Sequence, residues 1–164
     1  MIDVAINPLR TWNQHCLDGD ELATLSAQLR ANDLPHCDIE TSAGTFFDFR
    51  TERNEIAGYA GIEIFGPDGL LRSVLVLPAW RSEGVGGAIV EAMVEFACEQ
   101  GVQRLHLLTM RSADFFAARG FGPLPRAEAP ARIAATSEFA SLCPSSAVFM
   151  RRDLRAAPAL RAMT

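Results

Sequence analysis

The stretch RSEGVGG, residues 81–87, joins two segments of different pattern. The apolar run LLRSVLVL (70–77) before it predicts a strand. After it, Ile89, Met93 and Ala97 recur at helical spacing, which predicts a helix over 85–100 that Gly101 ends. Glycines at a junction from strand to helix let a ligand approach the backbone closely, and the helix N-terminus favours an anion. The surrounding residues must indicate which anion it is.

Two nucleotide-binding motifs do not fit this junction. A P-loop requires a lysine after its last glycine, and this sequence contains no lysine. A dinucleotide-binding turn requires a third glycine, where this chain has Ile89, and a carboxylate about 20 residues further on. The segment RLHLL (104–108) offers none, and the glycines follow a predicted antiparallel hairpin instead of opening a parallel sheet.

The rest of the chain predicts a mixed α/β domain over residues 1–154, with 155–164 as a C-terminal tail. A helix is expected over 18–33, where Leu22, Leu25 and Leu29 share a face and Asp18 and Glu21 form a capping box. Strands are expected at 2–6, 45–50, 55–65, 70–77, 103–110 and 146–154. Further helices are expected at 112–120 and 129–139, and a short extended segment at 121–126. The strands at 70–77 and 103–110, which the long helix connects, should be parallel.

Composition narrows the class of protein. A net charge of −5 and a pI near 5.2 argue against a nucleic-acid partner, and no apolar run reaches the ~20 residues that span a bilayer. No signal peptide is recognisable, so we expect a cytoplasmic protein. The scattered histidines and the absence of a CxxC pair argue against a protein-held metal. The four cysteines are Cys16, Cys37, Cys98 and Cys143.

The spacing Arg81-x-x-Gly84-x-Gly86 resembles the Q/R-x-x-G-x-G/A pyrophosphate loop of the GNAT superfamily of N-acetyltransferases. A second signature of that family, N-x-x-A-x-x-F-Y-x-x-x-G-F, is similar to TMRSADFFAARGF, residues 109–121. The segment TSEFASLCPSSA (136–147) is similar to the arsenic-resistance-linked branch of the family. The resemblance implies a mostly antiparallel sheet that splays at its parallel strand pair and is flanked by helices.

The resemblance also implies acetyl-CoA as co-substrate, with no metal. Backbone N–H groups of the loop would hold the pyrophosphate, and Val76 N–H would polarise the thioester carbonyl. The cofactor-binding residues implied are Leu75, Val76, Leu77, Arg81, Ser82, Glu83, Gly84, Val85, Gly86, Gly87, Ala88, Thr109, Ser112, Phe115 and Phe116.

One position departs from the family pattern. The tyrosine that usually protonates the leaving thiolate is replaced by Phe116, and the asparagine of the signature by Thr109. Other proton donors must then come from elsewhere, and SLCPSSA offers Cys143, Ser145 and Ser146. Unassisted departure of the thiolate is the alternative, because a thiol pKa of ~8.5 makes it a fair leaving group.

Glu63 is the acidic residue inside IAGYAGIEIF (56–65) and is the candidate base. A four-residue hairpin loop at 66–69 places Glu63 opposite Arg72. The pair is then either structural, or it binds the acceptor, with Arg72 holding a carboxylate and Glu63 the ammonium. Tyr59, His36 and Ser73 are further candidates for binding the substrate.

The expected function is transfer of an acetyl group from acetyl-CoA to the primary amine of a small molecule, amino acid-like or arsenic-related. The alternative is a non-catalytic module that binds or senses acyl-CoA, which the missing tyrosine suggests. We expect no nucleic acid or membrane as partner, and a homodimer is compatible with this class of protein.

Overall fold

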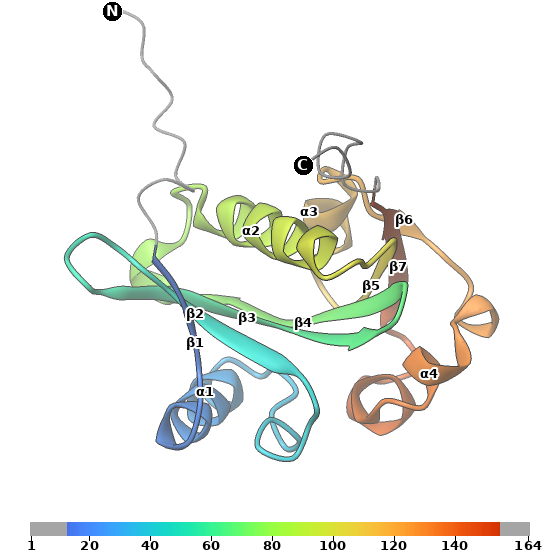
Figure 1. The fold of residues 1–164 in the computed structure, drawn as a ribbon, viewed down its shortest axis with the longest axis horizontal. Coiled ribbons are helices and arrows are strands. Elements are labelled where there is room, and N and C mark those ends of the chain that lie inside the picture. The colour runs from blue at the N-terminus through green and yellow to red at the C-terminus, as the bar shows by residue number, and fades with distance from the viewer. Residues whose placement is uncertain (1–12, 155–164) are drawn as a thin grey trace, which may run out of the picture. The chain divides into compact units, whose positions relative to one another are not determined.

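The computed structural model describes residues 13–154 (Figure 1). The strand predicted at 2–6 and the tail predicted at 155–164 lie outside this range. The strands are β1 (Asn13–Cys16), β2 (Thr45–Arg50), β3 (Ile56–Phe65), β4 (Asp68–Val76), β5 (Arg104–Thr109), β6 (Gly122–Pro123) and β7 (Val148–Asp153). The α-helices are α1 (Asp20–Ala31), α2 (Val85–Glu99), α3 (Ala113–Ala117) and α4 (Ala131–Ala134). Single turns occur at η2 (Pro78–Trp80), η3 (Arg126–Glu128) and η4 (Glu138–Leu142).

The strands form one mixed sheet in the order β1-β2-β3-β4-β5-β7-β6, in which β4 and β5 are the parallel pair. Their pairing is short: it runs from Asp68 opposite Arg104 to Leu70 opposite His106. β5 pairs with β7 over its whole length, from Arg104 opposite Asp153 to Thr109 opposite Val148. β5 therefore stays bonded to β7 after its pairing with β4 has ended, as the predicted splay requires.

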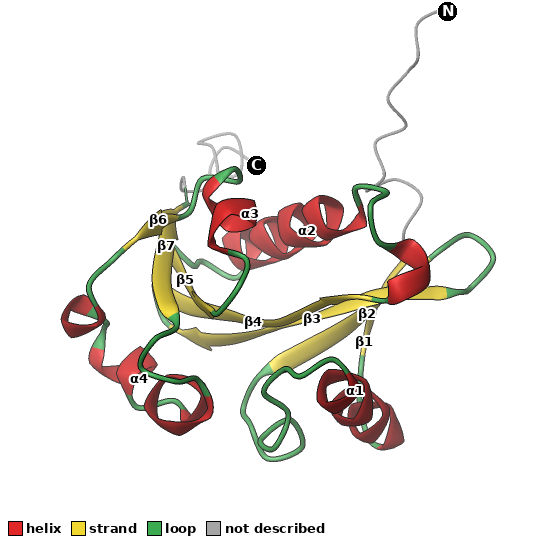
Figure 2. Ribbon diagram, turned by 180° about the vertical axis from the view of Figure 1, so that it is seen from behind, coloured by secondary structure: helices red, strands yellow, loops and turns green. Residues whose placement is uncertain are grey.

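The chain divides into two compact units, with the boundaries inside β3, β4 and α2. The first unit contains residues 13–61 and Ser73–Met93. In it, α1 lies on one side of the strands and the first half of α2 on the other (Figure 2). Leu25 and Leu29 of α1 pack on Phe46, Tyr59 and Leu75.

The second unit contains Ile62–Arg72 and residues 94–154. Its core holds Leu70, Ile133 and Phe149, so α4 covers one face of the strands, and α3 lies on the opposite face (Figures 1 and 2). His106 stacks on Phe149 with ring centroids 5.5 Å apart and an interplanar angle of 7°.

The predicted element order is confirmed from α1 to β7, and two local predictions are corrected. The hairpin loop between β3 and β4 has two residues, Gly66 and Pro67, instead of the four at 66–69. Gly66 has φ 63°, and because proline holds φ near −65°, the pair fits a type II′ turn.

The helix predicted over 129–139 is broken into α4 and the turn η4. β1 was not predicted. The predicted capping box is half present. Glu21 Oε1 accepts from the Asp18 N–H at 3.3 Å, but the N-cap residue of α1 is Gly19, which has no side chain to complete the box.

Candidate functional site

The glycine loop connects η2 to α2 in the first unit. Ser82 and Gly84 both adopt left-handed backbone conformations, with φ 69° and 77°. Left-handed residues between right-handed or extended ones turn successive N–H groups toward one side, which is a common anion-binding arrangement. The position where a Cβ of residue 84 would lie has no atom within 4 Å. Arg81 to Gly84 are exposed, whereas Val85 and Ala88 are buried and anchor the start of α2.

Arg81 is held at the base of this loop by two neutral acceptors. Its Nε donates to the carbonyl oxygen of Val76 at 3.1 Å, and its Nη2 donates to Oδ1 of Asn32 at 3.0 Å. Asn32 is the C-cap residue of α1 and was not predicted to take part in the site.

The end of β4 carries the residues expected beside the pantetheine arm. Ser73 has φ 59°, a conformation rare for a non-glycine residue inside a strand. Leu75 is buried in the core beneath α1, and Leu77 packs against that core. The Leu77 N–H donates to Ala57 O at 2.8 Å, and Val76 between them is half-buried.

A buried charge cluster lies in the second unit. Arg72 Nη1 donates to Glu63 Oε2 at 3.4 Å, and its Nε lies 4.0 Å from Glu138 Oε1. The side chain of Arg72 is 0% exposed, that of Glu138 5% and that of Glu63 9%. Glu63 and Arg72 are thus close to one another, as predicted. Glu138, which the sequence did not indicate, is the third member of the cluster.

Glu138 belongs to the segment 136–147, and local hydrogen bonds explain why it is placed there. Thr136 Oγ1 donates to Ile133 O at 2.7 Å and accepts from the Phe139 N–H at 3.3 Å. These bonds end α4 and begin η4, which turns Glu138 inward. Phe139 packs edge-on against Phe149 with ring centroids 5.3 Å apart.

The loop at 143–147 follows η4 and precedes β7. Cys143 is half-buried and its N–H donates to Glu138 O at 2.9 Å, while Ser145 is exposed. Arg126 ties this loop to η4: it donates to the carbonyl oxygens of Phe139, Pro144 and Ala147 at 3.2, 3.4 and 3.3 Å. Because Val148 pairs with Thr109, the loop meets β7 at the end of β7 that lies beside Thr109.

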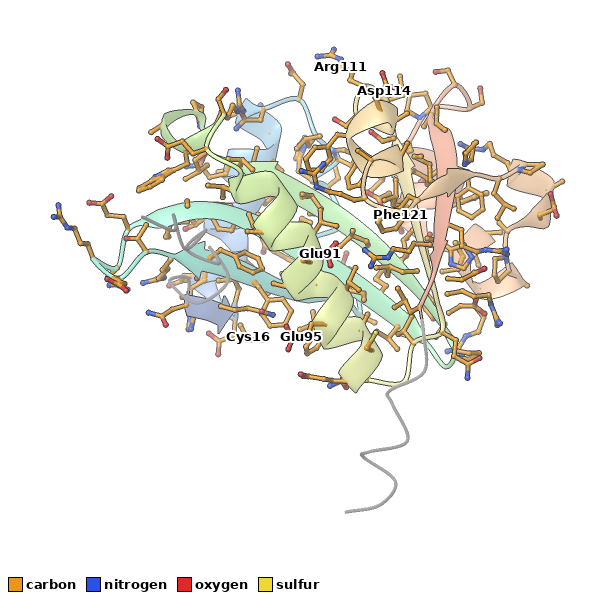
Figure 3. The ribbon with its side chains drawn as sticks, turned by 90° about the horizontal axis from the view of Figure 1, so that it is seen from above. Cys16, Glu91, Glu95, Arg111, Asp114 and Phe121 are labelled. Atoms are coloured by element: carbon orange, nitrogen blue, oxygen red, sulfur yellow. The ribbon has the colours of Figure 1, made fainter. Side chains whose placement is uncertain are left out.

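The second predicted signature forms the end of β5 and α3, also in the second unit. Thr109 Oγ1 accepts from the Ser112 N–H at 3.0 Å, which sets the turn into α3. Phe116 is 7% exposed and packs edge-on against Phe115 and Phe121, at 5.0 and 5.7 Å between centroids. Figure 3 shows Arg111 and Asp114 pointing outward at the start of α3.

Tyr59 and His36 lie in the first unit. Tyr59 is buried beneath α1, and burial raises the pKa of its phenol. His36 is half-buried in the loop after α1, and its Nδ1 lies 3.1 Å from Leu34 O. Neither of them is in the unit that holds Glu63 and Arg72.

His106 is a buried histidine of β5 for which the sequence predicts no functional role. Its Nδ1 lies 3.2 Å from Gly69 O, and its Nε2 lies 4.0 Å from Asp68 Oδ1. Burial lowers the pKa of its imidazole, which favours the neutral ring. Residues 13–154 contain no cluster of three or more histidine, cysteine or acidic residues suited to a metal ion. They also contain no helix long and apolar enough to span a membrane.

Comparison with known proteins agrees with this arrangement. Residues 7–121 match the model of the acetyltransferase (GNAT) family. Since the match covers more than half of the chain, the protein belongs to the GNAT acetyltransferase family.

Solved structures are similar in fold at low sequence identity. N-acetylglutamate synthase from Neisseria gonorrhoeae, complexed with coenzyme A and N-acetylglutamate, superposes with a TM-score of 0.69 at 18% identity over 88% of this chain and 35% of its own. A GNAT acetyltransferase from Staphylococcus aureus gives 0.65 at 18% identity, over 88% of this chain and 99% of its own. A Mycobacterium tuberculosis protein in complex with CoA gives 0.68 at 17% identity, over 87% and 99%.

This chain thus spans about a third of the Neisseria synthase and nearly all of the other two proteins. The likeness establishes the acyl-CoA N-acyltransferase fold, with its seven-stranded mixed sheet and single parallel pair β4–β5.

Proposed function

We propose that this protein transfers the acetyl group of acetyl-CoA to the primary amine of a small molecule by direct attack in a ternary complex. The observation that carries the proposal is the loop from Arg81 to Gly87, with its left-handed Ser82 and Gly84 and the open space at residue 84. Such a loop presents N–H groups and the positive end of α2 to an anion, as the pyrophosphate of CoA requires.

The residues proposed to bind CoA fall into three groups. Leu75 to Leu77 would lie along pantetheine, and Arg81 to Ala88 would bind the pyrophosphate. Thr109, Ser112, Phe115 and Phe116 follow from the second signature. Because Phe116 packs within an aromatic cluster, its contribution would be apolar contact and support of α3.

On the acceptor side we propose Glu63 as the group that receives the ammonium or its proton. Glu63 has the most exposed side chain of the buried cluster, whereas Arg72 is fully enclosed between two carboxylates. Arg72 would therefore orient Glu63, with Glu138 as its second anchor. Two carboxylates and one guanidinium leave a net charge of −1 when ionised, which favours a cationic acceptor. Roles for Tyr59, His36 and Ser73 in binding the acceptor stay predictions.

The proposed chemistry is attack of the neutral amine on the thioester carbonyl carbon. A C–N bond forms, the C–S bond breaks, and the amine proton passes to Glu63 or to water. CoA leaves as a thiolate, which Cys143 or Ser145 would protonate in place of the absent tyrosine. The similarity of residues 136–147 to the arsenic-resistance-linked branch supports an amino acid-like or arsenic-containing amine as acceptor.

The experiment that tests this proposal has two steps. Acetyl-CoA is first titrated into the protein by calorimetry, and thiol release is then followed with a panel of amines that includes amino acids and an arsenic-containing amino acid. Saturable binding and release that depends on the amine would support the proposal. Binding without release for every amine would favour the second candidate, a non-catalytic acyl-CoA sensor, which the buried Phe116 suggests. Failure to bind acetyl-CoA would overturn both.

A matched pair of variants tests the loop assignment. Gly84 and Gly101 have φ 77° and 86°, and neither position has an atom within 4 Å of its would-be Cβ. A side chain at either position adds ~1–2 kcal/mol of backbone strain, so both variants should lose similar stability. Gly84→Glu should abolish CoA binding, while Gly101→Glu should retain it. Equal CoA affinity in the two variants would refute the assignment.

We further propose that residues 1–154 act as one acetyltransferase domain in the cytoplasm, as a monomer or a homodimer. Sedimentation of the full chain, with and without acetyl-CoA, would distinguish the two oligomeric states.

A further inference from the structure

We infer that Asn32 is a positioning residue for coenzyme A: it fixes the Arg81 guanidinium at the pyrophosphate loop without neutralising its charge. The inference rests on the proposed function, since it concerns the same loop. No motif predicts it, because Asn32 lies 49 positions before Arg81 in the chain.

Asn32 is itself held by hydrogen bonds to α1. It caps α1, its backbone N–H donates to Leu29 O at 3.1 Å, and its Nδ2 donates to Gln28 O at 2.8 Å. The amide nitrogen is thus committed to the helix, so the amide oxygen is the atom presented to Arg81. Leu29, three residues earlier, is fully buried in the core of the first unit.

The second acceptor of Arg81 is tied to the same core. Val76 O accepts from Arg81 Nε, and Leu75, the residue before Val76, packs in the cluster that contains Leu29. The guanidinium is therefore clamped between the end of α1 and the end of β4. A guanidinium has five N–H donors, and the two bonds use two of them. Three donors remain for phosphate oxygens.

Both hydrogen-bond acceptors of Arg81 are neutral, so neither of them cancels its positive charge. Among the described residues the Arg81 side chain meets a carbonyl and an amide, with no carboxylate in ion-pair contact. Its full positive charge thus remains for an anion. The C-terminal end of α1 carries partial negative charge, which stabilises a nearby cation without cancelling it. An aspartate at position 32 would keep the bond but remove the net charge.

Arg81 is proposed to contact the pyrophosphate of CoA, so two thioesters that differ in this group test the inference. Acetyl-CoA contains the pyrophosphate, whereas acetyl-pantetheine carries the same thioester without it. Arg81→Ala should weaken CoA binding about tenfold or more, the value of a charged hydrogen bond. Asn32→Ala should weaken it about two- to tenfold, because binding must then order a long, free side chain. Asn32→Asp should weaken it at least as much, although the guanidinium stays in place.

Calorimetric CoA affinities of the single variants and of Asn32→Ala/Arg81→Ala form a double-mutant cycle, and kcat/KM is measured for both thioesters. The inference predicts that the double variant binds CoA no more weakly than Arg81→Ala, and that Asn32→Ala leaves kcat/KM for acetyl-pantetheine unchanged. Unchanged CoA affinity in Asn32→Ala, additive losses, or an equal loss with acetyl-pantetheine would overturn it. A wild-type protein that binds no CoA would overturn the proposed function as well.

Discussion

Replacing Arg72 by methionine is the sharpest test of the buried charge cluster. The Arg72 side chain is completely enclosed, and the side chains of Glu63 and Glu138 on either side of it are at most 9% exposed. Removing the guanidinium leaves two carboxylates buried near one another without the positive charge between them. Breaking a buried ion pair from one side costs about 3–5 kcal/mol. For a chain of this size that corresponds to a fall in Tm of about 6–20 °C.

The assay is thermal unfolding followed by circular dichroism at neutral pH, in low and in high salt. Arg151→Met is the matched control, because Arg151 pairs with Asp153 at 3.1 Å in a partly exposed position, where such pairs contribute about 0–1 kcal/mol. Adding Glu138→Gln to Arg72→Met should recover part of the loss, since it removes one of the two buried charges. A loss no larger than that of Arg151→Met would refute the structural role of Arg72.

Three further outcomes are expected. Glu63→Gln should lower kcat by about 10²–10⁴-fold if the carboxylate is the base, with the calorimetric Kd of acetyl-CoA unchanged; a change in Kd alone would contradict this role. Phe116→Tyr should lower stability by about 1–3 kcal/mol, because it adds a hydroxyl to a buried ring, and it should not raise kcat. A rise in kcat would show that a side chain at this position reaches the leaving group. Since burial lowers the pKa of His106 below 6.5, the unfolded chain takes up that proton first on acidification. Stability from this group is complete above about pH 6.5 and declines below it, so His106→Gln should show a smaller loss of ΔG between pH 7 and 5.5 than the wild type does.

The turn at the glycine loop was predictable because backbone chemistry leaves few alternatives there, whereas its binding of CoA stays a prediction. Gly84 occupies a left-handed conformation that few other residues adopt, and its spacing from Arg81 and Gly86 is short enough to form a motif. The neighbourhood of Glu63 and Arg72 was predicted as well, although the loop length used to derive it was wrong. Gly66 and Pro67 form a two-residue turn, and the two side chains are nevertheless in contact.

Glu138 and Asn32 could not be predicted from local pattern, for different reasons. Residues 129–139 have a helical composition, and only the Thr136 hydroxyl, by bonding both Ile133 O and the Phe139 N–H, shows where the helix stops. That interruption turns Glu138 toward Arg72. Asn32 looks like an ordinary helix cap in the sequence, and its second bond, to Arg81, exists because the core brings α1 beside the end of β4. The first depends on side-chain hydrogen bonds and the second on tertiary packing, and no sequence spacing encodes either.

The substitution of phenylalanine at position 116 affects the chemistry more than the binding of the cofactor. General acid catalysis by one side chain contributes about 10²–10⁴-fold, whereas rate enhancements by enzymes usually exceed 10⁶-fold. An enzyme without an acid at position 116 can thus still turn over, especially since a thiolate leaves more readily than an alkoxide. The glycine loop proposed to bind the pyrophosphate has a conformation suited to an anion: Ser82 and Gly84 are left-handed, and Arg81 bonds to neutral acceptors. A sensor of acyl-CoA would need this loop alone. It would not need a carboxylate cluster whose least buried member is Glu63. The presence of that cluster is the reason to favour the enzyme over the sensor.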